Sequence, residues 1–144
     1  MSGKHGPHRT RLNPDLVAGL LGRAEEAAKR AYAPYSGLHI GAALLTADGG
    51  IYQGCNVENA SYGLTWCAER TAVVSAVAAE GALMRIEAIA IWTDDLPVSP
   101  PCGACRQVLA EFGRDTVVVF NTTDGMVERT VGELLPDAFV GPID

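Results

Sequence analysis

The sequence predicts an α/β domain with three α/β/α layers, in which helices cover both faces of a mixed sheet of about five strands. The first reason is the order of the expected elements, which is helix, hairpin, helix, strand, helix, strand, strand. The second is that strand–helix–strand crossovers give parallel pairs, so the strands from Met84 onward are expected to be partly parallel. The third is that no repeat or linker divides residues 13–144, which are expected to form a single domain after a flexible polar tail, residues 1–12.

The N-terminal half of this domain is expected to contain one helix and one hairpin. Asn13 is a suitable N-cap, a proline follows it, apolar residues recur at helical spacing, and Pro34 is expected to end the helix. Residues 40–57 are interpreted as two strands joined by "ADGG". There Asp48 and Gly49 are expected to supply the positive φ angles of a tight turn.

The C-terminal half alternates helices and strands. A helix is expected from Cys67 to Glu80, because small apolar residues line one face and a glycine follows its end. A strand over residues 84–92 and a proline-rich loop lead to a second helix, residues 102–113, which also begins at a cysteine. The remaining expected elements are strands at 116–120 and 126–130 and a short helix at 131–136.

Composition excludes several classes of function. The chain has 144 residues, 48% of them hydrophobic, and a formal charge of −6, which gives no electrostatic reason to expect a nucleic acid partner. No run approaches the roughly 20 apolar residues of a membrane span, and the N-terminus lacks the apolar core of a secretory signal, so a cytoplasmic location is expected. The four cysteines should then stay reduced, as thiols or metal ligands.

Three of those cysteines stand at the starts of expected helices. They are Cys67, and Cys102 with Cys105 in "PCGAC". Backbone amides at helix N-termini stabilise thiolates, which are the form that binds a metal. A Cys-x-x-Cys pair with one remote cysteine fits zinc, and three protein ligands leave the fourth position open for water, as in catalytic sites.

Two charged residues follow the first of these cysteines. Glu69, two residues after Cys67, is placed to reach a metal-bound water without being a ligand, and to carry its proton to a substrate. Zinc lowers the pKa of its water towards about 7, but three thiolates work against this effect. Arg70, one turn after Cys67, is placed to offset them by donating hydrogen bonds to sulfur.

These motifs resemble those of a known family. "CAERTA" and "PCGACRQVL" are similar to the zinc deaminase pattern of a cysteine or histidine ligand, a non-ligand glutamate and a Pro-Cys-x-x-Cys pair. With "YAPYSGLHIGAALL", "GCNVENASYG" and "ELLPDAF", the resemblance extends from about Tyr32 to Phe139. The family is that of the small homotetrameric, zinc-dependent cytidine deaminases of pyrimidine nucleoside salvage.

The resemblance implies a fold, a reaction and partners. It implies a cytidine deaminase-like fold with one Zn²⁺ per subunit, and hydrolysis of cytidine and deoxycytidine to uridine and deoxyuridine with release of ammonia. In that reaction a zinc-bound hydroxide attacks C4 of the pyrimidine, while Glu69 passes protons to N3 and to the departing amine. The implied partners are a small nucleoside and three further copies of the chain, with neither nucleic acid nor membrane.

Further site residues are implied by the same resemblance. Asn56 and Glu58 are expected to hydrogen-bond the ribose hydroxyls, and residues two apart on an extended stretch do point to the same side. Ala68 is expected to contact the substrate. Tyr62 and Phe139 match positions that reach into the sites of neighbouring subunits, so that a monomer would have an incomplete pocket.

Two residues depart from the family pattern. Leu38 stands where an aromatic residue usually packs against the substrate, so its own contact should be weaker. Trp66 stands where a smaller residue is usual. Trp66 is expected either to restore the wall that Leu38 leaves short or, as the preferred interpretation, to pack in the core or in a subunit interface.

On the residues alone, less specific interpretations stay open. The cysteines could form a closed structural zinc site with Cys55 as the fourth ligand, although Cys55 lies on an expected strand and suits a small buried position. Glu69 and Arg70 could be exposed helix charges. Asn56 and Glu58 could be polar loop residues that cap the turn before "NASYG".

Two other functions compete with nucleoside salvage. One is deamination of a modified cytosine nucleoside, such as a blasticidin-type antibiotic, or of cytosine in a polynucleotide. The net negative charge of the chain disfavours a polynucleotide substrate, which requires a cationic groove. The segment "CNVENASYG" disfavours the antibiotic, because it resembles the ribose-binding segment of the nucleoside deaminases. The other is a noncatalytic zinc-stabilised module, which would have no need of Glu69 beside an open three-cysteine site.

Overall fold

The structure is a computed structural model that describes residues 12–142. The expected tail, residues 1–12, therefore lies outside the described residues except for its last residue. Within residues 12–142, no helix combines the length and the apolar character that a membrane crossing requires.

A five-stranded mixed sheet forms the middle layer, as the sequence predicts. The strand order is β2-β1-β3-β4-β5; β3 and β4 run parallel, and the other neighbouring pairs are antiparallel. The strands are β1 (Ile40–Thr46), β2 (Ile51–Cys55), β3 (Ile86–Thr93), β4 (Val117–Thr122) and β5 (Gly125–Thr130). The parallel pair is the one whose strands are joined through a helix, which is the crossover that the element order predicts.

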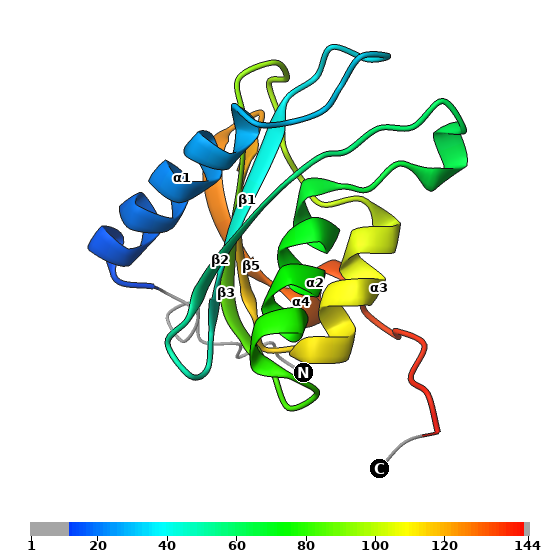
Figure 1. Cartoon of the computed structure of the whole chain (residues 1–144). Coiled ribbons are helices and arrows are strands. Elements are labelled where there is room, and N and C mark those ends of the chain that lie inside the picture. The colour runs from blue at the N-terminus through cyan, green and yellow to red at the C-terminus, as the bar shows by residue number, and fades with distance from the viewer. Residues whose placement is uncertain (1–11, 143–144) are drawn as a thin grey trace.

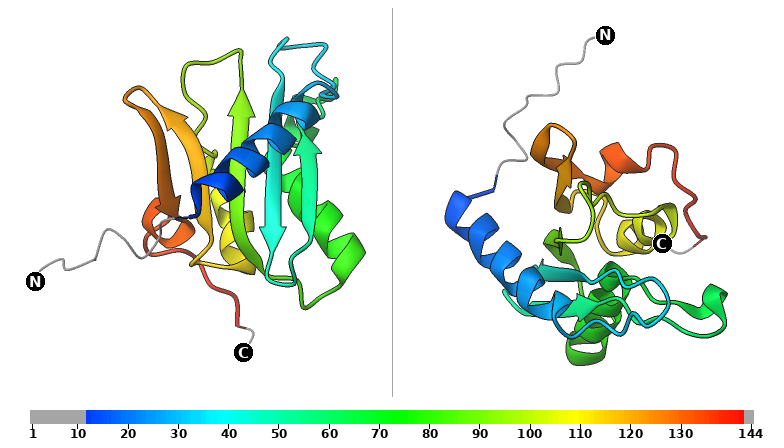
Figure 2. Two further views of the ribbon diagram at one scale, coloured as in Figure 1. Left: turned by 90° about the vertical axis from the view of Figure 1, so that its left-hand side faces the viewer. Right: turned by 90° about the horizontal axis from the view of Figure 1, so that it is seen from above.

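Helices cover both faces of the sheet and complete the three layers. Helix α1 (Pro14–Ala28) crosses one face, and α2 (Ala68–Glu80) and α3 (Gly103–Phe112) lie on the other (Figures 1 and 2). A short α4 (Val131–Leu134) follows β5, and a single 3₁₀ turn, η1 (Tyr62–Leu64), lies in the loop before α2. The two helices that begin at cysteines are thus on the same face.

The apolar core has one part on each side of the sheet. Alternate residues of β1 point to opposite faces of the sheet. Leu44 therefore packs with Val73 of α2 and Leu109 of α3 on one face, while Ala43 packs with Leu20 of α1 on the other. All five side chains are buried. This double burial fixes α2 and α3 against the sheet and therefore fixes the positions of their N-terminal cysteines.

Two glycines let helices approach strands closely. A Cβ atom on Gly41 would lie 1.8 Å from the carbonyl oxygen of Ala24 in α1. A Cβ atom on Gly54 would lie 2.4 Å from both the carbonyl oxygen of Ala68 and the amide nitrogen of Ala72 in α2. The absence of a side chain at Gly54 therefore allows the first turn of α2, which begins directly after Cys67, to pack closely against β2.

Two local predictions are wrong. Helix α1 ends at Ala28 instead of continuing to Pro34, because the Tyr32 N–H donates to the Asn56 carbonyl (3.0 Å) and draws the chain to the segment after β2. In the β1–β2 turn, only Gly49 has a positive φ, of 91°, and Asp48 does not. The connection spans residues 47–50 and is longer than the two-residue turn that would need two positive φ angles.

Candidate functional site

Three cysteine sulfurs meet where α2 and α3 begin. Cys67 is the N-cap residue of α2 and Cys102 that of α3, with Cys105 in the first turn of α3. The Sγ atoms of Cys67 and Cys102 are 3.9 Å apart, those of Cys102 and Cys105 are 3.3 Å apart, and all three lie within 4.8 Å of one another. The structure thus brings together the three cysteines that the sequence nominates.

The spacing and burial of these sulfurs fit a zinc ion. Tetrahedral zinc with Zn–S bonds of about 2.3 Å requires sulfurs about 3.8 Å apart, which the observed separations approach. Cys105 is buried, Cys67 is partly buried and Cys102 is exposed. The cluster therefore has a buried side and a side open to solvent, as a three-ligand site with one accessible position requires.

The electrostatics of the cluster favour a thiolate at Cys67. A hydrogen bond from the Cys105 side chain is the main cause that lowers the pKa of Cys67 to about 5, and Arg70 lowers it further, although partial burial opposes both. The pKa of Cys105 is raised, chiefly by its hydrogen bond with Cys67 and by burial. Positive ends of two helix dipoles point at the same cluster.

Glu69 lies in the first turn of α2 and is buried, with 5% of its surface exposed. Burial is the main cause that raises its pKa to about 7, and the charge of Cys67 adds to this effect. Its own backbone N–H and the Cys105 side chain oppose the rise by hydrogen bonding to the carboxylate. The interpretation of Glu69 as an exposed helix charge is therefore wrong, since it is a buried carboxyl beside the cysteine cluster.

Arg70 connects the cluster to the loop before α2. Its Nη2 donates to the Cys67 sulfur (3.4 Å) and to the Thr65 carbonyl (3.2 Å). Its Nε is buried and makes no hydrogen bond within the described part of the chain. The guanidinium carbon stands 5.6 Å from the centroid of the Trp66 ring, within cation–π range. The sequence predicts the Arg70–sulfur hydrogen bond but not the contact with Trp66.

Trp66 is not a core residue of this chain. Its exposed fraction is 45%, and it lines a surface hollow with Arg70, Glu58, Thr65 and other residues of the loop before α2. Of the two interpretations of Trp66, packing in the core of the subunit is therefore wrong. A place in a pocket wall or in a contact with another copy stays open.

Asn56 is buried and holds the segment that precedes β1. Its Nδ2 donates to the Leu38 carbonyl (2.8 Å), and its Oδ1 accepts from the Ile40 N–H (2.9 Å). Leu38 is partly buried. The amide thus fixes the backbone on both sides of residue 39. This role differs from capping of the turn before "NASYG", which is one interpretation of the sequence.

Glu58 accepts hydrogen bonds from two residues that sequence reasoning missed. The backbone N–H groups of Tyr35 (2.9 Å) and Ser36 (3.1 Å) donate to its Oε1, and the Ser36 hydroxyl donates to its Oε2. The Ser36 hydroxyl is the main cause that lowers the pKa of Glu58. The Ser-Gly pair directly before Leu38 indicates a turn, but nothing in that pattern identifies its partner as Glu58.

The remaining substrate candidates lie in different places. Ala68 is buried at the start of α2. Tyr62 is exposed in η1; its ring is 5.6 Å from that of Tyr35, and both line a hollow with Glu58. Phe139 is 78% exposed and lines a different hollow.

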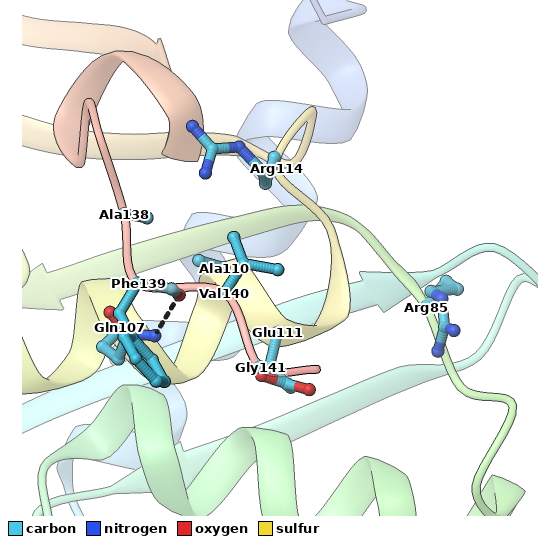
Figure 3. Close-up of a pocket in the computed structure, with 9 residues that line it drawn as sticks. All are labelled: Arg85, Gln107, Ala110, Glu111, Arg114, Ala138, Phe139, Val140 and Gly141. Carbon is cyan, nitrogen blue, oxygen red and sulfur yellow. Dashed lines mark hydrogen bonds between the residues drawn. The ribbon is translucent and has the colours of Figure 1, made fainter. Parts of the chain in front are cut away.

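Figure 3 shows the C-terminal segment against α3, where Gln107 donates to the Phe139 carbonyl (3.1 Å) beside a hollow of about 250 Å³. That hollow shares no lining residue with those around Glu58. Phe139 therefore does not join Glu58 and Tyr62 in the same chain.

Cys55 does not belong to the cysteine cluster. Among the described residues, the metal-ligating group consists of Cys67, Cys102 and Cys105. Cys55 ends β2, where its carbonyl accepts the Thr71 hydroxyl, and partial burial raises the pKa of its thiol. The structure gives no support to Cys55 as a fourth ligand.

Comparisons with known proteins agree with this geometry. The family model described as "Cytidine and deoxycytidylate deaminase zinc-binding region" matches residues 18–121. A cytidine deaminase of Halalkalibacterium halodurans is 50% identical over 122 residues, which cover 83% of this chain and 91% of the relative. One of Sporosarcina psychrophila is 47% identical over 126 residues, with 85% and 90% coverage.

Solved structures give the same result. The crystal structure of cytidine deaminase from Burkholderia pseudomallei superposes with a TM-score of 0.77 at 48% sequence identity. The superposition covers 85% of this chain and 98% of that chain. Residues 18–121, which match the family model, include both cysteine segments.

Proposed function

The chain belongs to the cytidine deaminase family of zinc-binding deaminases, and from this premise we propose that it hydrolyses cytidine and deoxycytidine to uridine and deoxyuridine in pyrimidine nucleoside salvage. Ammonia is the second product. The observation that carries the proposal is a buried non-ligand carboxylate, Glu69, beside three cysteine sulfurs that are open on one side. We assign this activity to residues 13–144 as a single domain.

The three sulfurs and the glutamate have separate roles in this proposal. Cys67, Cys102 and Cys105 would hold one Zn²⁺ per subunit. Zinc, when bound in such a site, makes a water nucleophilic at neutral pH. Glu69 takes up a proton from the attacking water and delivers it to N3 of the pyrimidine. It then carries the second proton of that water, from the oxygen now bonded to C4, to the amine, which leaves as ammonia.

Arg70 supports this chemistry without touching the substrate. Three thiolates would concentrate negative charge at the metal, and the Arg70 hydrogen bond to Cys67 withdraws part of it. Arg70 is therefore proposed as a positioning residue of the metal site.

Other residues bind the nucleoside. Asn56 and Glu58 are proposed to hydrogen-bond the sugar hydroxyls, and both are already fixed by hydrogen bonds to the segment around Leu38. Such preorganisation reduces the entropy lost on binding. Leu38 and Ala68 are proposed to contact the substrate through their apolar surfaces.

The proposed assembly is a homotetramer in which subunits share active sites. Tyr62 and Phe139 have exposed fractions of 73% and 78%, which leaves both rings available to another copy. Phe139 lies away from the Glu58 hollow of its own chain, which supports a role in a neighbour's site. A cytoplasmic location is proposed because cysteines stay reduced there and remain able to bind zinc.

The test is turnover by the zinc-loaded protein. Ammonia release and the ultraviolet change would be followed with cytidine, deoxycytidine, blasticidin S and single-stranded DNA, with metal analysis and mass by light scattering on the same sample. We expect turnover of the two nucleosides, one zinc per chain and a tetramer. Zinc-loaded tetramer that turns over none of the four compounds would overturn the proposal, and turnover of blasticidin S or DNA alone would reassign the substrate.

A further inference from the structure

The loop before β1 wraps around the carboxylate of Glu58. The Tyr32 carbonyl accepts the Glu58 N–H (2.9 Å), so the loop and the segment after β2 run side by side. From there the chain turns, with Gly37 at φ 74°, and brings both Tyr35 and Ser36 to the Glu58 side chain. The carboxylate therefore sits in a cradle of donors contributed by a segment 22 to 23 residues away in sequence.

The hydrogen bonds leave Glu58 with little free accepting capacity. An ionised carboxylate has about four acceptor positions. Oε1 accepts two backbone N–H groups, and Oε2 accepts the Ser36 hydroxyl. The free position is therefore on Oε2, and the Ser36 hydroxyl decides where that position points.

The direction of the Ser36 hydroxyl is itself fixed. Its oxygen accepts the N–H of Leu38 (3.0 Å), while its own proton is donated to Oε2 of Glu58. Leu38 is held in turn through its carbonyl by Asn56. One serine hydroxyl thus joins the carboxylate to the backbone that Asn56 anchors.

This arrangement opens onto a small hollow. Tyr35, Ser36, Glu58, Tyr62 and Thr65 line a space of about 210 Å³ on the surface. Two tyrosine rings in edge-to-face contact form one part of its wall, and the carboxylate is the charged acceptor within it. A polyhydroxylated ligand, such as a sugar, matches a hollow that contains both a charged acceptor and aromatic rings.

We infer that Ser36 is a positioning residue, which directs the free acceptor of Glu58 Oε2 to a hydroxyl of the nucleoside sugar. This inference rests on the proposed function. Ser36 does not touch the reacting atoms, so its effect belongs to substrate affinity and not to the chemical step. The lowered pKa of Glu58 agrees with this role, since the carboxylate remains purely an acceptor at neutral pH.

The test compares Ser36→Ala with Ser36→Thr on two substrates. Cytidine has sugar hydroxyls at positions 2′ and 3′, and 2′,3′-dideoxycytidine lacks both. We expect Ser36→Ala to raise KM for cytidine by about 3- to 12-fold, the size of one ordinary hydrogen bond, because the Glu58 carboxylate itself remains; kcat should be nearly unchanged. Ser36→Thr should restore most of the affinity because it retains a hydroxyl. For dideoxycytidine, Ser36→Ala and wild type should have the same KM.

Ser75→Ala is the matched control, because Ser75 is an exposed serine on α2 that lines none of the hollows around Glu58. A second readout needs no substrate: the pKa of the Glu58 carboxyl, followed by carbon-13 NMR and assigned with Glu58→Gln, should rise in Ser36→Ala. Circular dichroism verifies the fold of each variant.

The outcomes separate this inference from the proposed function. A wild-type protein that turns over cytidine, with Ser36→Ala unchanged or equally impaired on both substrates, would overturn the role of Ser36 alone. Failure of Ser36→Thr to restore affinity would also count against it. A wild-type protein that turns over no nucleoside would overturn both proposals, even if the NMR shift showed that Ser36 orients Glu58.

Discussion

Within each helix of the cysteine cluster, side chains are held by neighbours in sequence, and the two helices meet through Cys67 and Cys102; around Glu58, side chains are held by partners far along the chain. Arg70 donates to Cys67, three positions earlier, and Cys102 pairs with Cys105 inside one helical turn. Hydrogen bonds at the proposed sugar side, the region around Asn56 and Glu58, join residues 16 to 23 positions apart, from Asn56 to Ile40 and from Glu58 to Tyr35.

The two regions also differ in exposure, and this difference agrees with the different functions proposed for them. Cys105 and Glu69 are buried, so charges there interact strongly and suit proton transfer. Ser36 and Tyr35 are exposed, and Glu58 is partly exposed, which suits reversible binding of a polar ligand. Substitutions at the cluster should therefore lower kcat or metal content, and substitutions at the sugar side should raise KM.

The largest effect is expected from loss of a sulfur at the cluster. Cys105→Ser should remove most of the zinc and reduce turnover to background, because a neutral hydroxyl is a poor substitute for a thiolate ligand. Zinc per chain and cytidine turnover would be measured on the same preparation. Cys55→Ser, on a cysteine outside the cluster, should keep both; loss of zinc from that variant would restore Cys55 as a ligand.

Glu69→Gln comes next and should separate proton transfer from metal binding. The amide keeps the size of the side chain but cannot carry the proton, so kcat should fall by about 10²- to 10⁴-fold with zinc retained. Steady-state kinetics give kcat, and metal analysis gives the zinc content of the same preparation. Near-normal turnover would end the assignment of Glu69 as the proton carrier.

Glu58→Gln is the matched substitution at the sugar side and should act on affinity. Replacing a charged acceptor by a neutral one should raise KM for cytidine about 5- to 10-fold and change kcat much less. An equal fall in kcat for the two Gln variants would abolish the distinction between the regions.

The pH dependence of this effect follows from the lowered pKa of Glu58. Because the pKa is lowered, Glu58 stays ionised at every pH above the ordinary pKa of a Glu side chain. The affinity that the carboxylate supplies is lost only as the pH falls below that ordinary pKa. The ratio of KM between Glu58→Gln and wild type should therefore be constant from about pH 8 to about pH 5 and shrink in more acid solution. A ratio that already falls between pH 7 and pH 6 would contradict this.

The same contrast explains how much could be predicted from the sequence. Strand and helix order follow from periodicity and turn residues, and the mixed sheet follows from the crossover rule, so these predictions are confirmed. The end of α1 at Ala28 could not be foreseen, because it depends on a backbone hydrogen bond from Tyr32 to Asn56. Local patterns carry no information about such a distant partner.

The site divides in the same way. Cys67, Glu69 and Arg70 share one helical turn, so their proximity follows from helix geometry. Ser36 and Tyr35 gave no such signal, because their relation to Glu58 exists only after β1 and β2 have paired. The contact of Trp66 with Arg70 was also missed, since Trp66 precedes the helix and its orientation depends on the loop.

The smallest effect is expected from Trp66→Ile, at the border between the two regions. The Trp66 ring faces Arg70, which donates to Cys67, and an exposed cation–π contact is worth about 0.5 to 1 kcal/mol. Its loss should therefore speed zinc release to a chelator by about two- to fivefold. Leu64→Ala, an exposed neighbour in the same hollow, serves as the control. If Trp66→Ile dissociated the proposed tetramer and left zinc release unchanged, the ring would be assigned to a subunit interface instead, because only a contact through Arg70 reaches the metal ligands.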